Sequence, residues 1–72
     1  MPYTARLKAL REDNDDTQKD IAEILKIKHQ QYQRYESGKT EMPIRYLIEI
    51  CKHYNVSADY LLGLPKGLEW PR

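Results

Sequence analysis

The amino-acid sequence predicts an all-α protein, a compact five-helix bundle that contains a helix-turn-helix. Apolar residues recur every three to four positions in five segments, and no alternating stretch is long enough for a strand. Helix start signals separate these segments, with Thr17, Pro43 and Ser57 at suitable positions. With 72 residues and one cysteine, the chain has no internal disulfide and room for one small domain. We therefore expect a domain over residues 1–63 and a tail over residues 64–72.

The first two helices are predicted from spacing and capping. Residues 4–13 place Leu7 and Leu10 on one face, and the DND cluster that follows ends this helix. Thr17 can cap the second helix with its hydroxyl, and Asp20 completes a short-armed capping box. The apolar face of the second helix consists of Ile21, Ala22 and Leu25.

The third helix is predicted over residues 28–36, where the sequence is rich in glutamine, and Gly38 lies just past its last turn. About three residues separate it from the second helix, which is the spacing of a helix-turn-helix. Pro43 suits the start of a fourth helix, and Ser57 can cap a short fifth one. The buried face of the fourth helix is predicted to contain Leu47, Ile50, Cys51 and Tyr54.

Charge is unevenly distributed along a chain whose net charge is only +1. Residues 26–46 carry five basic side chains against two acidic ones. The basic ones are Lys26, Lys28, Arg34, Lys39 and Arg45. Because charges act only within about 8 Å at physiological salt, this local excess is what a phosphate backbone would meet. The chain also lacks a signal-peptide pattern and any run of eighteen apolar residues, which predicts a cytoplasmic protein without membrane contact.

The glutamine-rich helix has two chemically different faces. At 100° per residue, Tyr32 and Tyr35 lie close together on one face. His29, Gln30, Gln33 and Arg34 spread over the other. Glutamine can pair with adenine and arginine with guanine in the major groove, so we expect these four residues to read bases. The alternative is that the glutamines are ordinary solvent-facing helix formers.

The run TQKDIAEILKIKHQQYQRYESGKT, followed by PIRYLIEICKHYNVSADYLLGL, resembles the phage repressor and Cro type of helix-turn-helix domain, the XRE family. The resemblance covers roughly residues 5–63. The positions at family spacing include Thr17, Gln18, Ile21, Ala22, Leu25, Ile27, Tyr35, Glu36 and Gly38. It implies a lambda-repressor-like bundle and a sequence-specific double-stranded DNA-binding transcriptional regulator, a repressor, that reads the major groove with helix 28–36.

The resemblance also implies roles for individual side chains. An ion pair between Arg11 and Glu36 would tie the first helix to the end of the third without touching a base. Contacts to phosphate are expected from Gln18, Lys28, Gln31, Tyr32, Lys39 and Thr40, with the Tyr32 hydroxyl at the surface. The alternative is that three of these side chains are only solvated, Lys39 and Thr40 as turn residues and Gln18 as an exposed residue of a first helical turn.

Four positions depart from the family pattern, one of them Tyr32, which is bulkier than the aliphatic residue that is usual there. Lys26 stands where glycine is usual, so the turn is expected to differ. Lys28 cannot accept a capping hydrogen bond, so the start of the third helix is expected to fray or to shift by one residue. Asp16 occupies a place that is usually apolar, which removes the hydrophobic staple to Ile21.

Self-association is expected because one recognition helix reads only a few base pairs. We predict a homodimer, at least on DNA, with Tyr60, Leu64, Leu68 and Trp70 at the interface. Folding of the tail back onto its own bundle is the alternative. A second functional class also remains open: a protein-interaction module such as an antitoxin-type partner-binding protein. Such a protein needs an exposed apolar patch, and the tail is the only candidate in the sequence.

Catalytic and metal sites are not predicted. Cys51 and His53 face away from each other on a helix, so with His29 they cannot form a zinc site. The SGKT and DNDDTQ stretches lack the glycines that a P-loop and a calcium loop require. No nucleophile has a base at helical spacing. We therefore expect no enzyme activity, no metal and no cofactor.

Overall fold

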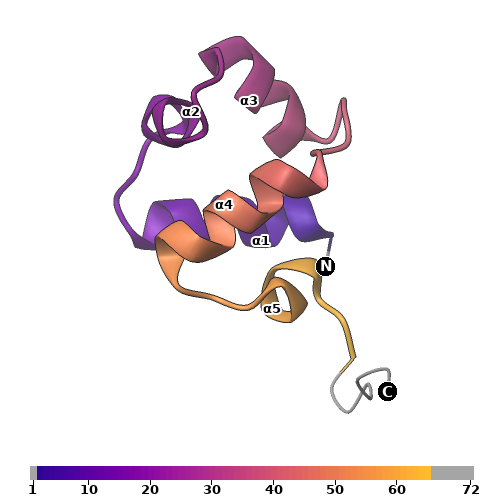
Figure 1. Ribbon diagram of the computed structural model, residues 1–72. Coiled ribbons are helices and arrows are strands. Elements are labelled where there is room, and N and C mark those ends of the chain that lie inside the picture. Colours follow the sequence, from indigo (N-terminus) through magenta and orange to yellow (C-terminus); the bar gives the residue numbers. More distant parts are fainter. Residues whose placement is uncertain (1, 66–72) are drawn as a thin grey trace.

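Five α-helices make up the structure of residues 2–65, which are the residues that the computed structural model describes (Figure 1). They are α1 (Tyr3–Asp13), α2 (Gln18–Leu25), α3 (His29–Ser37), α4 (Ile44–Tyr54) and α5 (Ala58–Leu62). No strand is present in this part of the chain. The predicted all-α class and the five predicted helices are confirmed.

The helices surround one core. Figure 1 shows α4 crossing in front of α1, with α2 and α3 above this pair and α5 below it. The largest fully buried side chains are Leu7, Ile21, Tyr32, Ile50 and Leu61, one from each helix. Full burial of a side chain of this size contributes about 1.5–3 kcal/mol, so each helix is anchored by its own core residue. None of the helices within residues 2–65 is long and apolar enough to cross a membrane.

The helix starts predicted at Thr17 and Ser57 are confirmed. The amide of Asp20 donates to Thr17 Oγ1 at 3.1 Å, and the amide of Thr17 donates back to Asp20 Oδ2 at 2.8 Å. This second bond holds the pKa of the Asp20 carboxyl below its ordinary value. Ser57 Oγ accepts from the amide of Tyr60 at 3.2 Å. These bonds satisfy backbone donors that a first helical turn leaves unpaired.

The turn between α2 and α3 contains a left-handed lysine. Lys26 has φ 58° and ψ 42°, the conformation that glycine would take most easily. The expectation that lysine would change the turn is therefore wrong, and the strain stays in the backbone at a cost of about 1–2 kcal/mol. At the start of α3, Lys28 makes no side-chain capping bond, and the helix begins at His29, one residue later than predicted.

Asp16 takes a polar role where an apolar residue is usual. Tyr54 Oη donates to Asp16 Oδ2 at 2.7 Å, and Arg11 Nη1 donates to the Asp16 backbone carbonyl at 2.9 Å. His53 Nε2 lies 3.7 Å from the same Asp16 carboxylate. The loop before α2 is thus held to α1 and to the end of α4 by polar contacts instead of a hydrophobic staple.

Candidate nucleic-acid interface

The third helix presents a row of polar side chains to solvent. His29, Gln30, Gln33 and Arg34 are all exposed. Its opposite face is buried: Tyr32 and Tyr35 are 0% and 5% exposed, and Glu36 is 7% exposed. The helical period places these two sets on opposite sides, and the core fixes which side faces inward.

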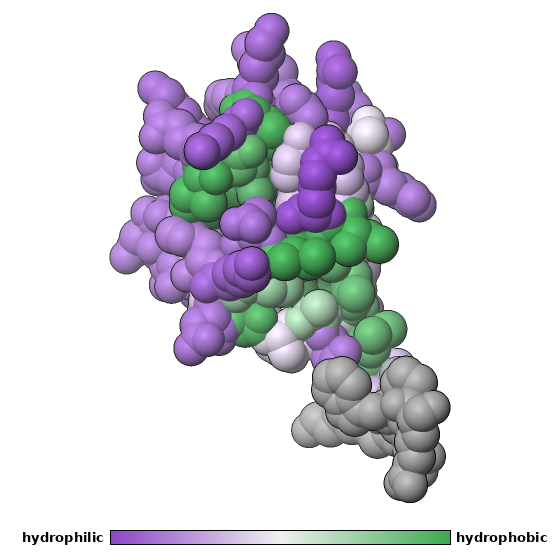
Figure 2. Space-filling model, in the orientation of Figure 1, coloured by the Kyte–Doolittle hydropathy of each residue, from purple (hydrophilic) through white to green (hydrophobic). Residues whose placement is uncertain are grey.

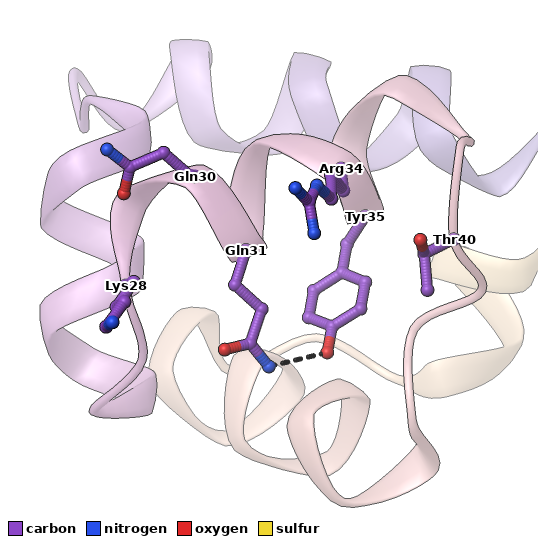
Figure 3. Close-up of a pocket in the computed structure, with 6 residues that line it drawn as sticks. All are labelled: Lys28, Gln30, Gln31, Arg34, Tyr35 and Thr40. Carbon is purple, nitrogen blue, oxygen red and sulfur yellow. Dashed lines mark hydrogen bonds between the residues drawn. The ribbon is translucent and has the colours of Figure 1, made fainter.

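Two shallow polar hollows flank this row, and Gln30 and Arg34 border both. The first hollow is lined by Lys28, Gln30, Gln31, Arg34, Tyr35 and Thr40 (Figure 3). The second is lined by Gln30, Gln33, Arg34, Ser37 and Lys39. The structure therefore brings three of the four expected base-reading residues together with cationic or hydroxyl side chains on both sides.

Tyr35, which the sequence assigned only to packing, lines the first hollow and holds one of its side chains in place. Gln31 Nε2 donates to Tyr35 Oη at 2.8 Å, as Figure 3 shows. The Tyr35 ring packs against Tyr46 of α4 with 5.9 Å between centroids. Arg45 places its guanidinium over the Tyr46 ring at 4.7 Å. A helical wheel could not reveal this arrangement, because the tip of a buried tyrosine can reach the rim of the core.

Arg11, Glu36, Gln18 and His29 form a connected polar network. Arg11 Nε and Nη2 donate to the two oxygens of the Glu36 carboxylate at 3.0 and 2.8 Å. Gln18 Nε2 also donates to Glu36 Oε1, at 3.2 Å. His29 Nε2 lies 3.4 Å from Gln18 Oε1. The network joins α1, both ends of α3 and the start of α2.

Glu36 stays charged although it is buried. Burial alone would raise the pKa of its carboxyl, but hydrogen bonds from Arg11 and Gln18, together with the neighbouring Tyr32 hydroxyl, outweigh that effect and hold the pKa below its ordinary value. The same bond raises the pKa of Arg11. Both polar ends of the Gln18 amide are engaged within the protein, toward Glu36 and His29. The second N–H of Gln18 Nε2 is not used by these contacts, so it can still make the phosphate contact that the sequence predicts.

Tyr32 does not lie at the surface, so the predicted phosphate contact of its hydroxyl is wrong. Its side chain is 0% exposed and belongs to the central core. The hydroxyl is buried next to the Glu36 carboxylate. Burial is the main reason that the pKa of this phenol is raised. The wheel placed Tyr32 on the inner face correctly but could not show that it lies at the centre of that face.

The remaining predicted site residues lie elsewhere. Tyr60 and Leu64 are 49% and 44% exposed, and the Arg6 guanidinium lies 5.7 Å from the Tyr60 ring centroid. Leu68 and Trp70 fall outside the described residues. Within residues 2–65, no group of three His, Cys, Asp or Glu side chains is placed to hold a metal ion.

Comparison with known proteins places the chain in a family. A helix-turn-helix family matches residues 7–61. YobD of Bacillus subtilis (strain 168), an uncharacterized HTH-type transcriptional regulator, is 36% identical over 62 residues, which are 86% of this chain and 55% of YobD. ImmR of the same organism, an HTH-type transcriptional regulator, is 40% identical over 63 residues, which are 88% of this chain and 50% of ImmR. The chain spans about half the length of these curated relatives. No solved structure matches it significantly. The match over residues 7–61, with these relatives, confirms the resemblance found in the sequence: the chain belongs to the helix-turn-helix family and is of the XRE type.

Proposed function

We propose that this protein is a sequence-specific double-stranded DNA-binding transcriptional regulator, a repressor, rather than an enzyme. In this proposal, α3 enters the major groove with its N-terminal residues foremost. The observation that carries it is the exposed row of His29, Gln30, Gln33 and Arg34, with polar hollows beside it. Two relatives that are named HTH-type transcriptional regulators support it.

The side chains divide into two roles. Gln30 and Arg34 lie one turn apart and border both hollows, so they are placed to read neighbouring bases by paired hydrogen bonds. Lys28 and Thr40 border one hollow and Lys39 borders the other, so they would contact phosphates on either side of the groove. A regulator bound in this way represses by occupying the site that polymerase needs.

Pairing belongs to the same proposal. One α3 helix reads a few base pairs, whereas two helices about 34 Å apart read two half-sites on one face of the duplex. We propose that two copies meet through Tyr60, Leu64, Leu68 and Trp70, with residues 64–72 acting as a tail to a domain of residues 1–63. Exposure of Tyr60 and Leu64 supports this interface.

A pair of alanine variants tests the division of roles. Sequences bound from a random duplex pool are selected with wild type, and affinities are then measured by fluorescence anisotropy. Gln30→Ala should relax preference at one base pair by about 1–3 kcal/mol. Lys39→Ala should weaken binding to all sequences alike, and it should reduce the slope of log affinity against log salt concentration by about 1. Lys8→Ala is the matched control, because Lys8 is exposed on α1 and borders neither hollow.

Two results would refute the assignment. An unchanged ranking of bound sequences for Gln30→Ala would remove this residue from base reading. Wild-type affinity that stays flat between about 50 and 200 mM salt would refute the phosphate contacts, because bound cations must release counterions from DNA.

A protein-interaction module of the antitoxin type remains the second candidate. One observation favours it: Ile44 and Ile48 on α4 are 73% and 47% exposed. The sequence had suggested that the tail is the only exposed apolar surface, and these two residues add a second one. These residues lie one turn apart on α4, and the sequence had assigned only the other face of this helix to packing. A chain that binds no duplex in the selection would favour this alternative.

A further inference from the structure

An apolar groove runs along α4 and α5, on a face of the protein that the proposed DNA contacts do not use. It consists of two adjoining hollows of about 520 and 280 Å³, both lined by Ile44, Leu47 and Leu62. The larger hollow also contains Ile48 and Cys51. The shared residues make the two hollows one continuous feature.

The side chains along this groove are unusually exposed for their size. Ile44 is 73% exposed, Ile48 47% and Leu62 38%. Figure 2 shows apolar side chains across the middle of this face and onward toward the C-terminal end, among hydrophilic neighbours. A contiguous apolar surface rimmed by polar residues is typical of a surface that another segment covers.

The chain itself contains a segment with suitable chemistry. Residues 66–72, KGLEWPR, lie outside the described residues and hold two large apolar side chains, Leu68 and Trp70. Their charges also match the groove, which has Lys52 in one hollow and Glu41 in the other. Glu69 lies between the two apolar residues and Lys66 precedes them, so each rim charge has an opposite charge available.

The course of the chain favours the groove of a second copy. Gly63, in a left-handed conformation, ends α5, and the amide of Leu64 donates to the Asp59 carbonyl at 3.0 Å. Figure 1 shows residues 63–65 leading away from α4. A return to the groove of the same chain would require the chain to reverse direction within a few residues, which favours the groove of a second copy.

The area that a stable pair must bury points the same way. A standard interface buries about 800 Å² on each partner. Besides the part-exposed side chains of α4 and α5, an exchanged segment adds a leucine and a tryptophan, the latter worth about 200 Å². In a two-fold pair every such contact occurs twice.

We propose that residues 66–72 of each copy lie in the α4–α5 groove of a second copy, with Leu68 and Trp70 against Ile44, Ile48 and Leu62. This inference rests on the pairing proposed above and adds the surface that receives the tail. It predicts that Cys51, which lines the groove, lies beside the second copy's segment.

Cross-linking tests this placement directly, because Cys51 is the chain's single cysteine. Wild-type protein is mixed with a longer-tagged Leu68→Cys/Cys51→Ala variant and oxidised with glutathione disulfide. A mixed disulfide between Cys51 and the introduced cysteine is expected as a band of intermediate mass. Lys8→Cys/Cys51→Ala is the control for random collision, since Lys8 is exposed outside the groove.

Fluorescence gives a second readout without oxidation, because Trp70 is the only tryptophan. Its emission should move to shorter wavelength as protein concentration rises, and Ile48→Ser should abolish this shift while circular dichroism stays unchanged. Glu49→Ser is the matched control, an exposed neighbour on α4 that does not line the groove.

The outcomes separate this inference from the pairing itself. Sedimentation that shows a dimer, with no more mixed disulfide than the Lys8→Cys control, overturns the groove placement and leaves the pairing intact. A monomer at all concentrations, both free and on a duplex from the selection, overturns both. A disulfide within one chain, formed at high dilution by Leu68→Cys with Cys51 retained, overturns exchange in favour of docking onto the same copy.

Discussion

Replacing Arg11 by alanine should remove a large share of the stability of this domain. Glu36 is 7% exposed, and Arg11 supplies two of the three hydrogen bonds to its carboxylate. The Arg11 side chain is itself only 12% exposed, so water screens the pair weakly. Removing one partner of a buried pair costs about 3–5 kcal/mol, because the other charge is left uncompensated. A domain of this size has about 4–10 kcal/mol in total, so Arg11→Ala should be close to unfolded.

Urea denaturation followed by circular dichroism measures this loss. Replacing both partners with apolar residues, as in Arg11→Met/Glu36→Met, should recover most of the stability, because no buried charge remains. Lys8→Ala, an exposed change on the same helix, should stay within about 0.5 kcal/mol of wild type. The reasoning is refuted if Arg11→Ala loses no more than Lys8→Ala, or if the double variant is less stable than Arg11→Ala.

Three further changes have expected outcomes that can be measured. Acid should destabilise wild type more than Glu36→Gln in pH-dependent denaturation. The folded-state pKa of Glu36 is lowered below its ordinary value of 4.5. The charged carboxylate therefore contributes to the free energy of unfolding above that value, and this contribution is lost as the pH falls through the folded pKa. Parallel pH profiles would contradict this. Tyr32→Phe should leave DNA affinity unchanged, since the hydroxyl that it removes is buried beside Glu36 and does not reach the surface. A loss of affinity in anisotropy would show that the hydroxyl reaches DNA after all. Lys26→Gly should stabilise the protein by about 1 kcal/mol in thermal denaturation by relieving a left-handed backbone, whereas Lys19→Gly inside α2 should destabilise it by a similar amount. Equal effects of the two glycines would contradict the strain at position 26.

Local features of the sequence predicted most of the fold. The caps at Thr17 and Ser57 and the apolar spacing of each helix depend on neighbours in the chain, so they are readable without a structure. The two tyrosines of α3 are different, because a helical period cannot tell which one reaches the core centre. Tyr32 is fully buried, whereas the Tyr35 hydroxyl reaches the first hollow.

Contacts between distant segments limit how much of the candidate site can be predicted from the sequence. Gln18 is engaged with Glu36 and His29 only because the fold brings the start of α2 beside α3. The exposure of Ile44 and Ile48 likewise depends on how distant segments pack, and not on neighbours in the sequence. Since α4 has apolar residues on more than one face, its sequence alone does not say which face the bundle covers.

The outer row of α3 contributes little to holding the protein together. Gln30, Gln33 and Arg34 are exposed, and their side chains take part in no hydrogen bond or ion pair within residues 2–65, while the inner face is fixed by core packing and by Arg11. Exposed substitutions away from such contacts usually change stability by less than about 0.5 kcal/mol. Mutation can therefore alter these three positions without first compensating for a weakened fold. A preference for a different DNA sequence can then evolve, or be engineered, in single steps.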